Sequence, residues 1–109
     1  MAFDENLDKR IRQILNRWEI SEAKKMFGGM CYLNQGNMVC GIYKEYLILR
    51  LKPETAAELL QKEHFRPFDI TGRPMKGWVM VAPEAISDDG ELEKYLLLCR
   101  EFVNTLPPK

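Results

Sequence analysis

The chain has 109 residues, the length of one ordinary domain, and we expect a single domain over residues 1–109. Hydrophobic residues make up 46% and charged residues 29%, a composition that is typical of globular proteins and argues against intrinsic disorder. Lys and Arg number 16, as do Asp and Glu, so the net charge is zero. Binding of nucleic acid through bulk phosphate contacts is therefore not expected.

No stretch of the sequence has the pattern of a membrane segment. A spanning helix needs about 20 apolar residues, whereas the longest apolar runs, such as residues 78–82, have about five. The chain starts with acidic residues and has no apolar segment there, which is unlike a secretory signal peptide. Three cysteines are too few, and odd in number, for a disulfide scaffold. We therefore expect a cytoplasmic protein with reduced thiols and no membrane contact.

A helix is predicted over residues 4–18. Its apolar side chains recur every three or four positions, as on the buried side of an amphipathic helix. This stripe consists of Leu7, Ile11, Ile14, Leu15 and Trp18. Asp4 is suited to cap the first turn, and we interpret the basic residues around the stripe as a solvated surface.

Two hairpins are predicted within residues 26–51. A first turn at Gln35-Gly36 places Cys31 opposite Cys40, and a second turn lies at residues 44–45. This register makes one sheet face wholly apolar, which identifies it as the core face. The core face holds Cys31, Leu33, Met38, Cys40, Ile42, Leu47, Leu49 and Leu51. The opposite face holds Met30, Tyr32, Val39, Gly41, Tyr43, Tyr46, Ile48 and Arg50.

The second half of the chain continues with a short helix and extended segments. Pro53 suits the first turn of a helix that we predict to reach about residue 63. Extended chain is expected over residues 64–70 and 75–81, on either side of a turn at residues 71–74.

A final helix follows, with Ser87 or Asp88 at its start. Its apolar stripe is Leu92, Tyr95, Leu96, Cys99, Phe102 and Val103. The predicted order is therefore α-β-β-β-α-β-β-α. An antiparallel sheet with helices on one face is a two-layer α+β sandwich, which is the fold class that we predict.

Cys31 and Cys40 are candidates for chemistry because the predicted register brings them face to face. A disulfide, a redox pair or a shared metal ion are the alternatives to simple packing. With His64 as the single histidine, the chain offers a poor set of zinc ligands. We interpret these cysteines and Cys99 as buried core residues, and we expect no metal and no cofactor.

Basic side chains concentrate in residues 64–78. Arg66, Arg73 and Lys76 stand there against a single acidic residue, between prolines that stiffen the segment. Arg50, at the end of the third predicted strand, can join them. Such a group can bind a small anion through charge-assisted hydrogen bonds. The alternative is a surface turn whose cations pair with nearby acids.

The predicted non-core face of the sheet is aromatic. Tyr32, Tyr43, Tyr46 and Ile48 lie along it in our register. Large amphipathic side chains gathered on one surface are typical of protein interfaces. We therefore expect a protein contact here, with a homodimer as its most economical form. The alternatives are a face covered by another element of the chain and a merely wet sheet surface.

The sequence resembles the N-terminal domain of the TfoX/Sxy family, which is known for competence regulation in bacteria. The resemblance rests on KMFGGMC at residues 25–31, GNMVCG at 36–41, YLILR at 46–50, TGRPMKGW at 71–78 and LPPK at 106–109. These motifs cover nearly the whole chain in the family's order, and the block from Gly72 to Gly77 is the most specific part.

The resemblance implies a two-layer α+β fold similar to secretion-chaperone-like domains and no established catalytic activity. Competence regulators of this family also carry a C-terminal helical domain, so we expect this chain, which ends at Lys109, to be a stand-alone domain of the N-terminal type. We predict a non-enzymatic regulatory or protein-interaction module. The alternative is a small anion-binding protein or minor enzyme that uses Arg50, Arg66, Arg73 and Lys76.

Overall fold

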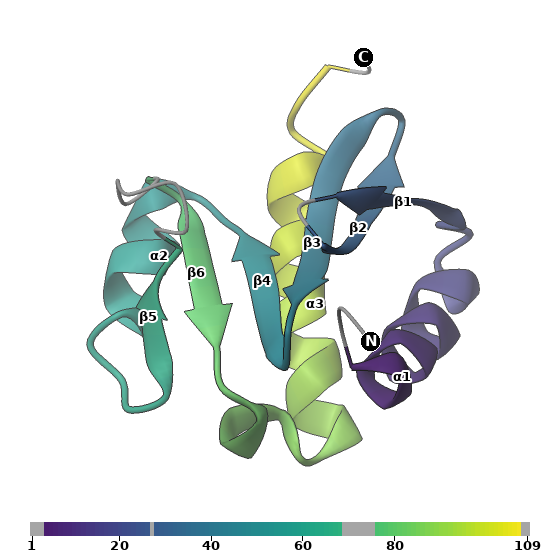
Figure 1. Cartoon of the computed structure of the whole chain (residues 1–109). Helices are drawn as coiled ribbons and strands as arrows, with labels where there is room; N and C mark the ends of the chain where they lie inside the picture. Colours follow the sequence, from purple (N-terminus) through teal and green to yellow (C-terminus); the bar gives the residue numbers. More distant parts are fainter. Residues whose placement is uncertain (1–3, 27, 69–75, 108–109) are drawn as a thin grey trace.

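The computed structural model describes residues 4–26, 28–68 and 76–107. Within these residues, six strands and three α-helices make an α+β fold, as predicted (Figure 1). In chain order the elements are α1 (Glu5–Arg17), β1 (Glu22–Met26), β2 (Gly29–Asn34), β3 (Asn37–Tyr43), β4 (Tyr46–Arg50), α2 (Pro53–Leu59), β5 (Phe65–Pro67), β6 (Trp78–Val81), the 3₁₀ helix η1 (Pro83–Ile86) and α3 (Asp89–Val103).

All strands belong to one antiparallel sheet with the order β1-β2-β3-β4-β6-β5. One face of this sheet packs against all three helices and forms the main hydrophobic core. The helices contribute Leu7, Ile11, Leu15, Ala56, Leu92 and Leu96, and the strands contribute Cys40, Ile42, Leu47, Leu49, Val79 and Val81. Figure 1 shows α3 running behind β3 and β4.

Both long helices begin at the predicted aspartates. The Asp4 carboxylate accepts hydrogen bonds from the backbone N–H groups of Asn6 (2.9 Å) and Leu7 (3.2 Å). Asp88 likewise caps α3 by accepting from the N–H of Glu91 at 3.2 Å. These bonds satisfy amide groups that have no partner within the helix, which explains why the helices start there.

The two predicted hairpin turns are confirmed. Gln35 and Gly36 join β2 to β3 with φ angles of 55° and 84°, the left-handed conformation that a two-residue hairpin turn of type I′ requires. In the second hairpin Lys44 also has a positive φ of 57°, and Tyr43 pairs with Tyr46 around the turn. The β3–β4 register is therefore the predicted one.

The register between β2 and β3 differs from the prediction. Leu33 pairs with Met38 as expected, but Tyr32 pairs with Cys40, so Val39 is an extra residue in β3. This β-bulge shifts Cys31 opposite Gly41, and the predicted Cys31–Cys40 pair is wrong. Beyond the bulge the faces of β2 are exchanged: Met30 and Tyr32 lie in the main core.

Strand β1 was not predicted. Its sequence, EAKKM, lacks the alternating apolar pattern, since Lys24 and Lys25 are exposed and Ala23 is half-buried. Exposed lysines are typical of an edge strand, which pairs on one side only. In the second half, α2 ends at Leu59, and within the described residues the two extended segments contain β5 and β6. The predicted turn at residues 71–74 lies outside the described residues.

Candidate functional site

The sheet face turned away from the helices carries a second, smaller cluster of side chains. We call it the open face. It consists of Met38, Tyr43, Tyr46, Ile48, Phe68, Trp78 and Met80. No residue of a helix belongs to this cluster within the described part of the chain. Phe68 and Trp78 pack with ring centroids 6.1 Å apart, while Ile48 and Met80 fill the middle and are buried.

Cationic side chains lie over the aromatic rings of the open face. The Arg66 guanidinium carbon is 5.9 Å from the Tyr46 ring centroid, and its Nη1 is 3.5 Å from the Tyr46 hydroxyl oxygen. The Lys44 ammonium lies 5.4 Å from the Tyr43 centroid. These distances are typical of cation–π contacts. The surface therefore combines half-exposed aromatic rings with positive charge.

Arg50 occupies the far end of β4. Its guanidinium carbon lies 5.5 Å from the Trp78 ring centroid and 5.9 Å from that of Phe102, and its Nη1 donates to the Met38 carbonyl at 3.4 Å. Arg50 thus joins the open face to the end of α3. These contacts fix the position of both its charge and the Trp78 ring.

The tyrosines predicted to share a contact surface lie in two environments. Tyr43 and Tyr46 lie on the open face and are half-buried, as an exposed contact surface requires. Ile48 lies on the same face but is 2% exposed, so it supports its neighbours from beneath. The prediction for Tyr32 is wrong: because of the bulge at Val39, its side chain lies in the main core and not on the open face.

Tyr32 takes part in a small polar cluster beneath α1. Its hydroxyl donates to the Asp8 carboxylate, which also accepts from Arg12 Nε at 2.8 Å. The Arg12 guanidinium lies 5.7 Å from the Tyr32 ring centroid. Burial, and secondarily the hydrogen bond to Asp8, raise the pKa of Tyr32 far above its usual range. The hydroxyl therefore stays protonated and pins α1 to β2.

The residues predicted to bind an anion lie at separate places. Arg66 reaches toward Tyr46 at the beginning of β4, whereas Arg50 lies at the end of that strand beside Trp78. Lys76 is exposed beside a groove near α2, and Arg73 lies outside the described residues. The described cations therefore point in different directions, and anion binding by this group stays a prediction.

The three cysteines are free and buried, and their expected packing role is consistent with their chemistry. Burial raises the pKa of Cys31 and of Cys40, and it raises the pKa of Cys99 to about 12. A thiol reacts as the thiolate, so a raised pKa and a buried sulfur both make it a poor nucleophile.

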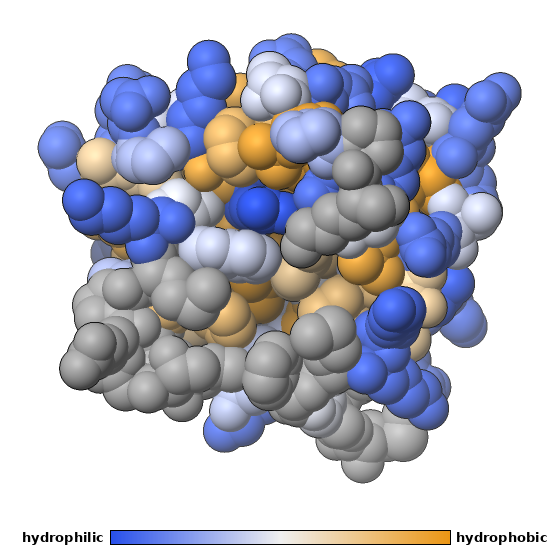
Figure 2. Space-filling view, turned by 90° about the horizontal axis from the view of Figure 1, so that it is seen from above, coloured by the Kyte–Doolittle hydropathy of each residue, from blue (hydrophilic) through white to orange (hydrophobic). Residues whose placement is uncertain are grey.

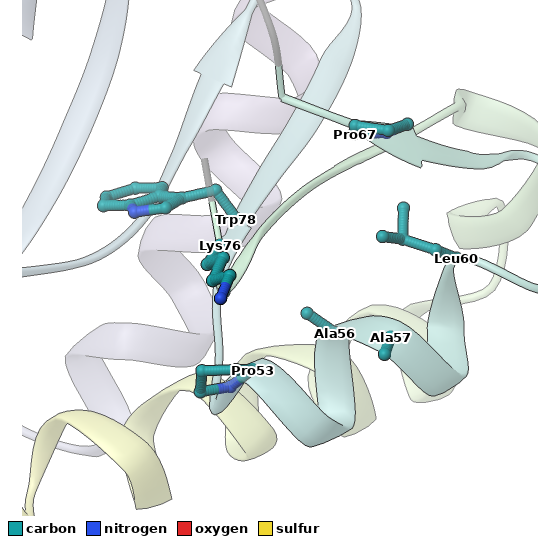
Figure 3. Close-up of a pocket in the computed structure, with 8 residues that line it drawn as sticks. Pro53, Ala56, Ala57, Leu60, Pro67, Lys76 and Trp78 are labelled. Atoms are coloured by element: carbon teal, nitrogen blue, oxygen red, sulfur yellow. The ribbon is translucent and has the colours of Figure 1, made fainter. Parts of the chain in front are cut away.

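A groove between α2 and the β5–β6 edge was missed by sequence reasoning. It has a volume of about 310 Å³ and lies against Pro53, Ala56, Ala57, Leu60, Pro67, Lys76, Gly77 and Trp78 (Figure 3). The small residues of α2 leave this space, and they gave no signal because they also suit an ordinary helix surface. Lys76 was singled out for its charge, not for its apolar neighbours.

Three further properties of the described structure concern its surface hydropathy, its helices and its metal-ligating side chains. Figure 2, a view from above, shows hydrophobic residues gathered in the middle of that side of the molecule with some hydrophilic residues among them, and mostly hydrophilic residues along its upper and right edges. Among the described helices, none has the length and apolarity that crossing a bilayer requires. The described residues also hold no group of three or more His, Cys, Asp or Glu side chains placed to share a metal ion.

Comparison with known proteins identifies the family. A family model described as the TfoX N-terminal domain matches residues 13–102, which is most of the chain from α1 to α3. The chain therefore belongs to the TfoX N-terminal domain family, as the motifs indicated. No curated protein and no solved structure matches the chain.

Proposed function

We propose that this member of the TfoX N-terminal domain family is a non-catalytic regulatory module of the cytoplasm that binds another protein through its open face. The observation that carries the proposal is the set of half-exposed rings of Tyr43, Tyr46 and Trp78, each with a cation within 6 Å of its centroid. Family membership supports the regulatory part of the proposal, and three free thiols suit a reducing compartment.

The chemistry of these side chains favours a protein partner. Tyrosine, tryptophan and arginine are the residues that most often dominate the binding energy of interfaces. Stacking on the rings already restricts Arg50 and Arg66, so less side-chain entropy is lost when a partner covers them. The buried Ile48 and Met80 give the rings a rigid base.

Two properties make a non-catalytic role the better fit. The thiols, which are the strongest nucleophiles that the chain carries, are buried and have raised pKa values. The Tyr32 hydroxyl is bound to Asp8 within the core rather than presented to a substrate. Both groups are used for packing, while the half-exposed aromatic groups gather on the open face.

A second copy of the chain is the simplest partner. A net charge of zero gives little long-range repulsion between copies. Two open faces related by a twofold axis would bury the same aromatic residues on both sides. A different protein would cover the same surface, and the experiment below distinguishes the two.

The test replaces two surface tyrosines with charged residues. Tyr43→Glu combined with Tyr46→Glu places two carboxylates on the open face, which should abolish association while the helical circular dichroism signal stays unchanged. Sedimentation at high micromolar concentration measures self-association, and a pull-down from the host measures binding of another protein. The matched control is Gln13→Glu with Asn16→Glu, which adds the same charge to the exposed side of α1.

The proposal is supported if the wild type self-associates or retains one host protein, and if the tyrosine variant loses this binding while the α1 variant keeps it. The proposal would be overturned if the wild type is monomeric and if the tyrosine variant also retains every host protein that the wild type retains.

A further inference from the structure

We propose that the groove between α2 and the β5–β6 edge is a binding site for a small monocarboxylate with an apolar body. This site adjoins the proposed protein contact, with which it shares Trp78, but its other lining residues belong to α2, to the end of β5 and to residues 76–77 rather than to the open face. The inference rests on the shape of the groove, on its apolar walls and on the position of one ammonium group.

Apart from Lys76, the residues that Figure 3 labels around the groove are apolar. Pro53, Ala56 and Ala57 line it along α2, and Pro67 faces them from the end of β5. Leu60 and Trp78 lie toward its two ends. The short side chains of α2 leave open space, while the larger ones present apolar surface. A hydrocarbon group bound here would have its surface removed from contact with water on several sides, which favours binding.

Lys76 is the one charged side chain among the described residues that line the groove. It is exposed and lies beside Trp78, so its ammonium group can meet a ligand at the mouth. An ammonium group beside an apolar hollow matches a ligand with one negative end and an apolar remainder. The acidic residues of α2, Glu54 and Glu58, are exposed and do not contribute to the lining.

The volume limits the size of the ligand. About 310 Å³ is at the lower end of the range for small-molecule sites, roughly 300–1,000 Å³. A short aliphatic or single-ring carboxylate fits this volume, whereas a long acyl chain does not. The geometry therefore points to a compact monocarboxylate.

Gly77 gives the site a fixed shape. It has a φ of 83°, and its carbonyl accepts a hydrogen bond from the Leu51 amide at 2.6 Å. A side chain at residue 77 would lie 2.6 Å from the Leu51 carbonyl oxygen, so the backbone here tolerates glycine alone. This close contact holds Lys76 and Trp78 beside the beginning of α2.

The experiment uses hexanoate as the probe, with 1-hexanol and hexylammonium as ligands of matched length. Two-dimensional nuclear magnetic resonance follows the Trp78 indole N–H and the Ala57 amide during each titration. We expect hexanoate to shift both signals and to bind more tightly than hexanol, with hexylammonium the weakest. The expected difference between hexanoate and hexanol is about two- to fivefold, the size of one exposed ion pair.

Variants separate the role of charge from that of the apolar walls. Lys76→Met should weaken hexanoate binding about two- to fivefold and remove the preference over hexanol. Lys24→Met, an exposed lysine on the distant strand β1, is the matched control and should change nothing. Lys76→Glu should reverse the order, so that hexylammonium binds best. Ala57→Phe should fill the groove and abolish binding of all three probes.

Several results would overturn the proposal. These are the absence of shifts at Trp78 and Ala57, equal binding of hexanoate and hexanol, and an unchanged order in Lys76→Glu. If Ala57→Phe fails to unfold cooperatively, the two Lys76 variants decide, because residue 76 is exposed and its replacement should leave the fold intact. Failure here leaves the protein-contact proposal unaffected, since that experiment depends on Tyr43 and Tyr46.

Discussion

Tyr32 joins the first helix to the sheet through a single hydroxyl group. The hydroxyl is buried against α1 and donates to Asp8, whose carboxylate is also held by Arg12. A hydrogen bond to a charged acceptor contributes about 1.5–3 kcal/mol. The sequence placed Tyr32 on the exposed side, and the bulge at Val39 explains why a residue with a polar end lies in the core instead.

Tyr32→Phe should lower the free energy of unfolding by about 1.5–3 kcal/mol, because the hydroxyl is lost and Asp8 keeps one partner fewer. Urea unfolding followed by circular dichroism measures the change. Tyr43→Phe is the matched control: its ring is half-buried on the open face, and its loss of a hydroxyl should cost within about 0.5 kcal/mol. Equal effects of the two substitutions would contradict the role given to the Tyr32–Asp8 bond.

The same residue predicts how stability depends on alkaline pH. The pKa of Tyr32 is raised in the folded chain, while the unfolded value stays near about 10. Its contribution is therefore fully present below about pH 10 and is lost as the pH rises above it, since the unfolded chain then releases the proton. The stability difference between wild type and Tyr32→Phe should shrink above about pH 10. If the stability difference between the two proteins stays constant up to about pH 11, Tyr32 ionises as freely in the folded state as in the unfolded chain.

The bulge in β3 determines which strand residues reach which face. Val39 and Cys40 both belong to the main core, and Met38 turns to the open face above Gly41. A Cβ atom at residue 41 would lie 2.7 Å from the Met30 carbonyl oxygen and 2.8 Å from Met38 Cε. The close approach of β2 and β3 at the bulge thus depends on a residue without a side chain.

Gly41→Ala should destabilise the protein by about 1–3 kcal/mol, because the Met30 carbonyl is backbone and cannot move aside. Thermal unfolding provides the measurement. Gly90→Ala, in the exposed first turn of α3, is the comparison. Its nearest obstacle is the Asp88 side chain, and alanine favours a helix by up to about 1 kcal/mol, so its net effect should be small. A Gly41 variant as stable as the Gly90 variant would mean that the two strands lie farther apart.

Local signals explain which elements could be predicted. Two helix N-termini and one hairpin turn depend on side chains or φ angles close to the residues concerned, so the sequence identifies them. They lie at Asp4, at Asp88 and at Gln35-Gly36. The bulge at Val39 has no such signal: the uninterrupted alternating register looked better because it made one face wholly apolar. Strand β1 pairs with β2 alone. Its two consecutive lysines interrupt the alternation of apolar and polar residues, so the sequence pattern does not predict a strand there.

The candidate surfaces were predictable to different degrees for a related reason. Tyr43 and Tyr46 follow from alternation beyond the bulge, where the predicted and observed faces agree. The groove depends on small residues of α2 lying opposite Pro67 and Trp78, which are distant in sequence. Charge alone grouped Arg50, Arg66 and Lys76, yet Arg50 lies over Trp78, Arg66 lies over Tyr46, and Lys76 is exposed beside the groove near α2. Side-chain contacts across the sheet, which no local pattern encodes, decide where such groups point.

At the scale of the whole molecule, we expect the β1 edge of the sheet to open more readily than the main core. Cys40 and Cys99 lie in the main core between the sheet and α3, and both are fully buried. Cys31 is 6% exposed and lies on β2, which pairs along one side with the edge strand β1. Residues beside an edge strand become accessible when that strand opens locally, whereas core residues become accessible when the whole domain unfolds.

Thiol labelling measures these two kinds of opening in one experiment. Cys31 should react with an alkylating reagent at a rate that depends little on added urea, because release of β1 exposes little surface. Cys40 and Cys99 should react together, at a rate that rises steeply with urea, because they require global unfolding. Mass spectrometry of peptides after timed quenching identifies each site, and a Cys31→Ser variant shows that the slow pair is independent of the first. If all three thiols react at one urea-dependent rate, β1 unfolds with the core and the molecule behaves as a single cooperative unit.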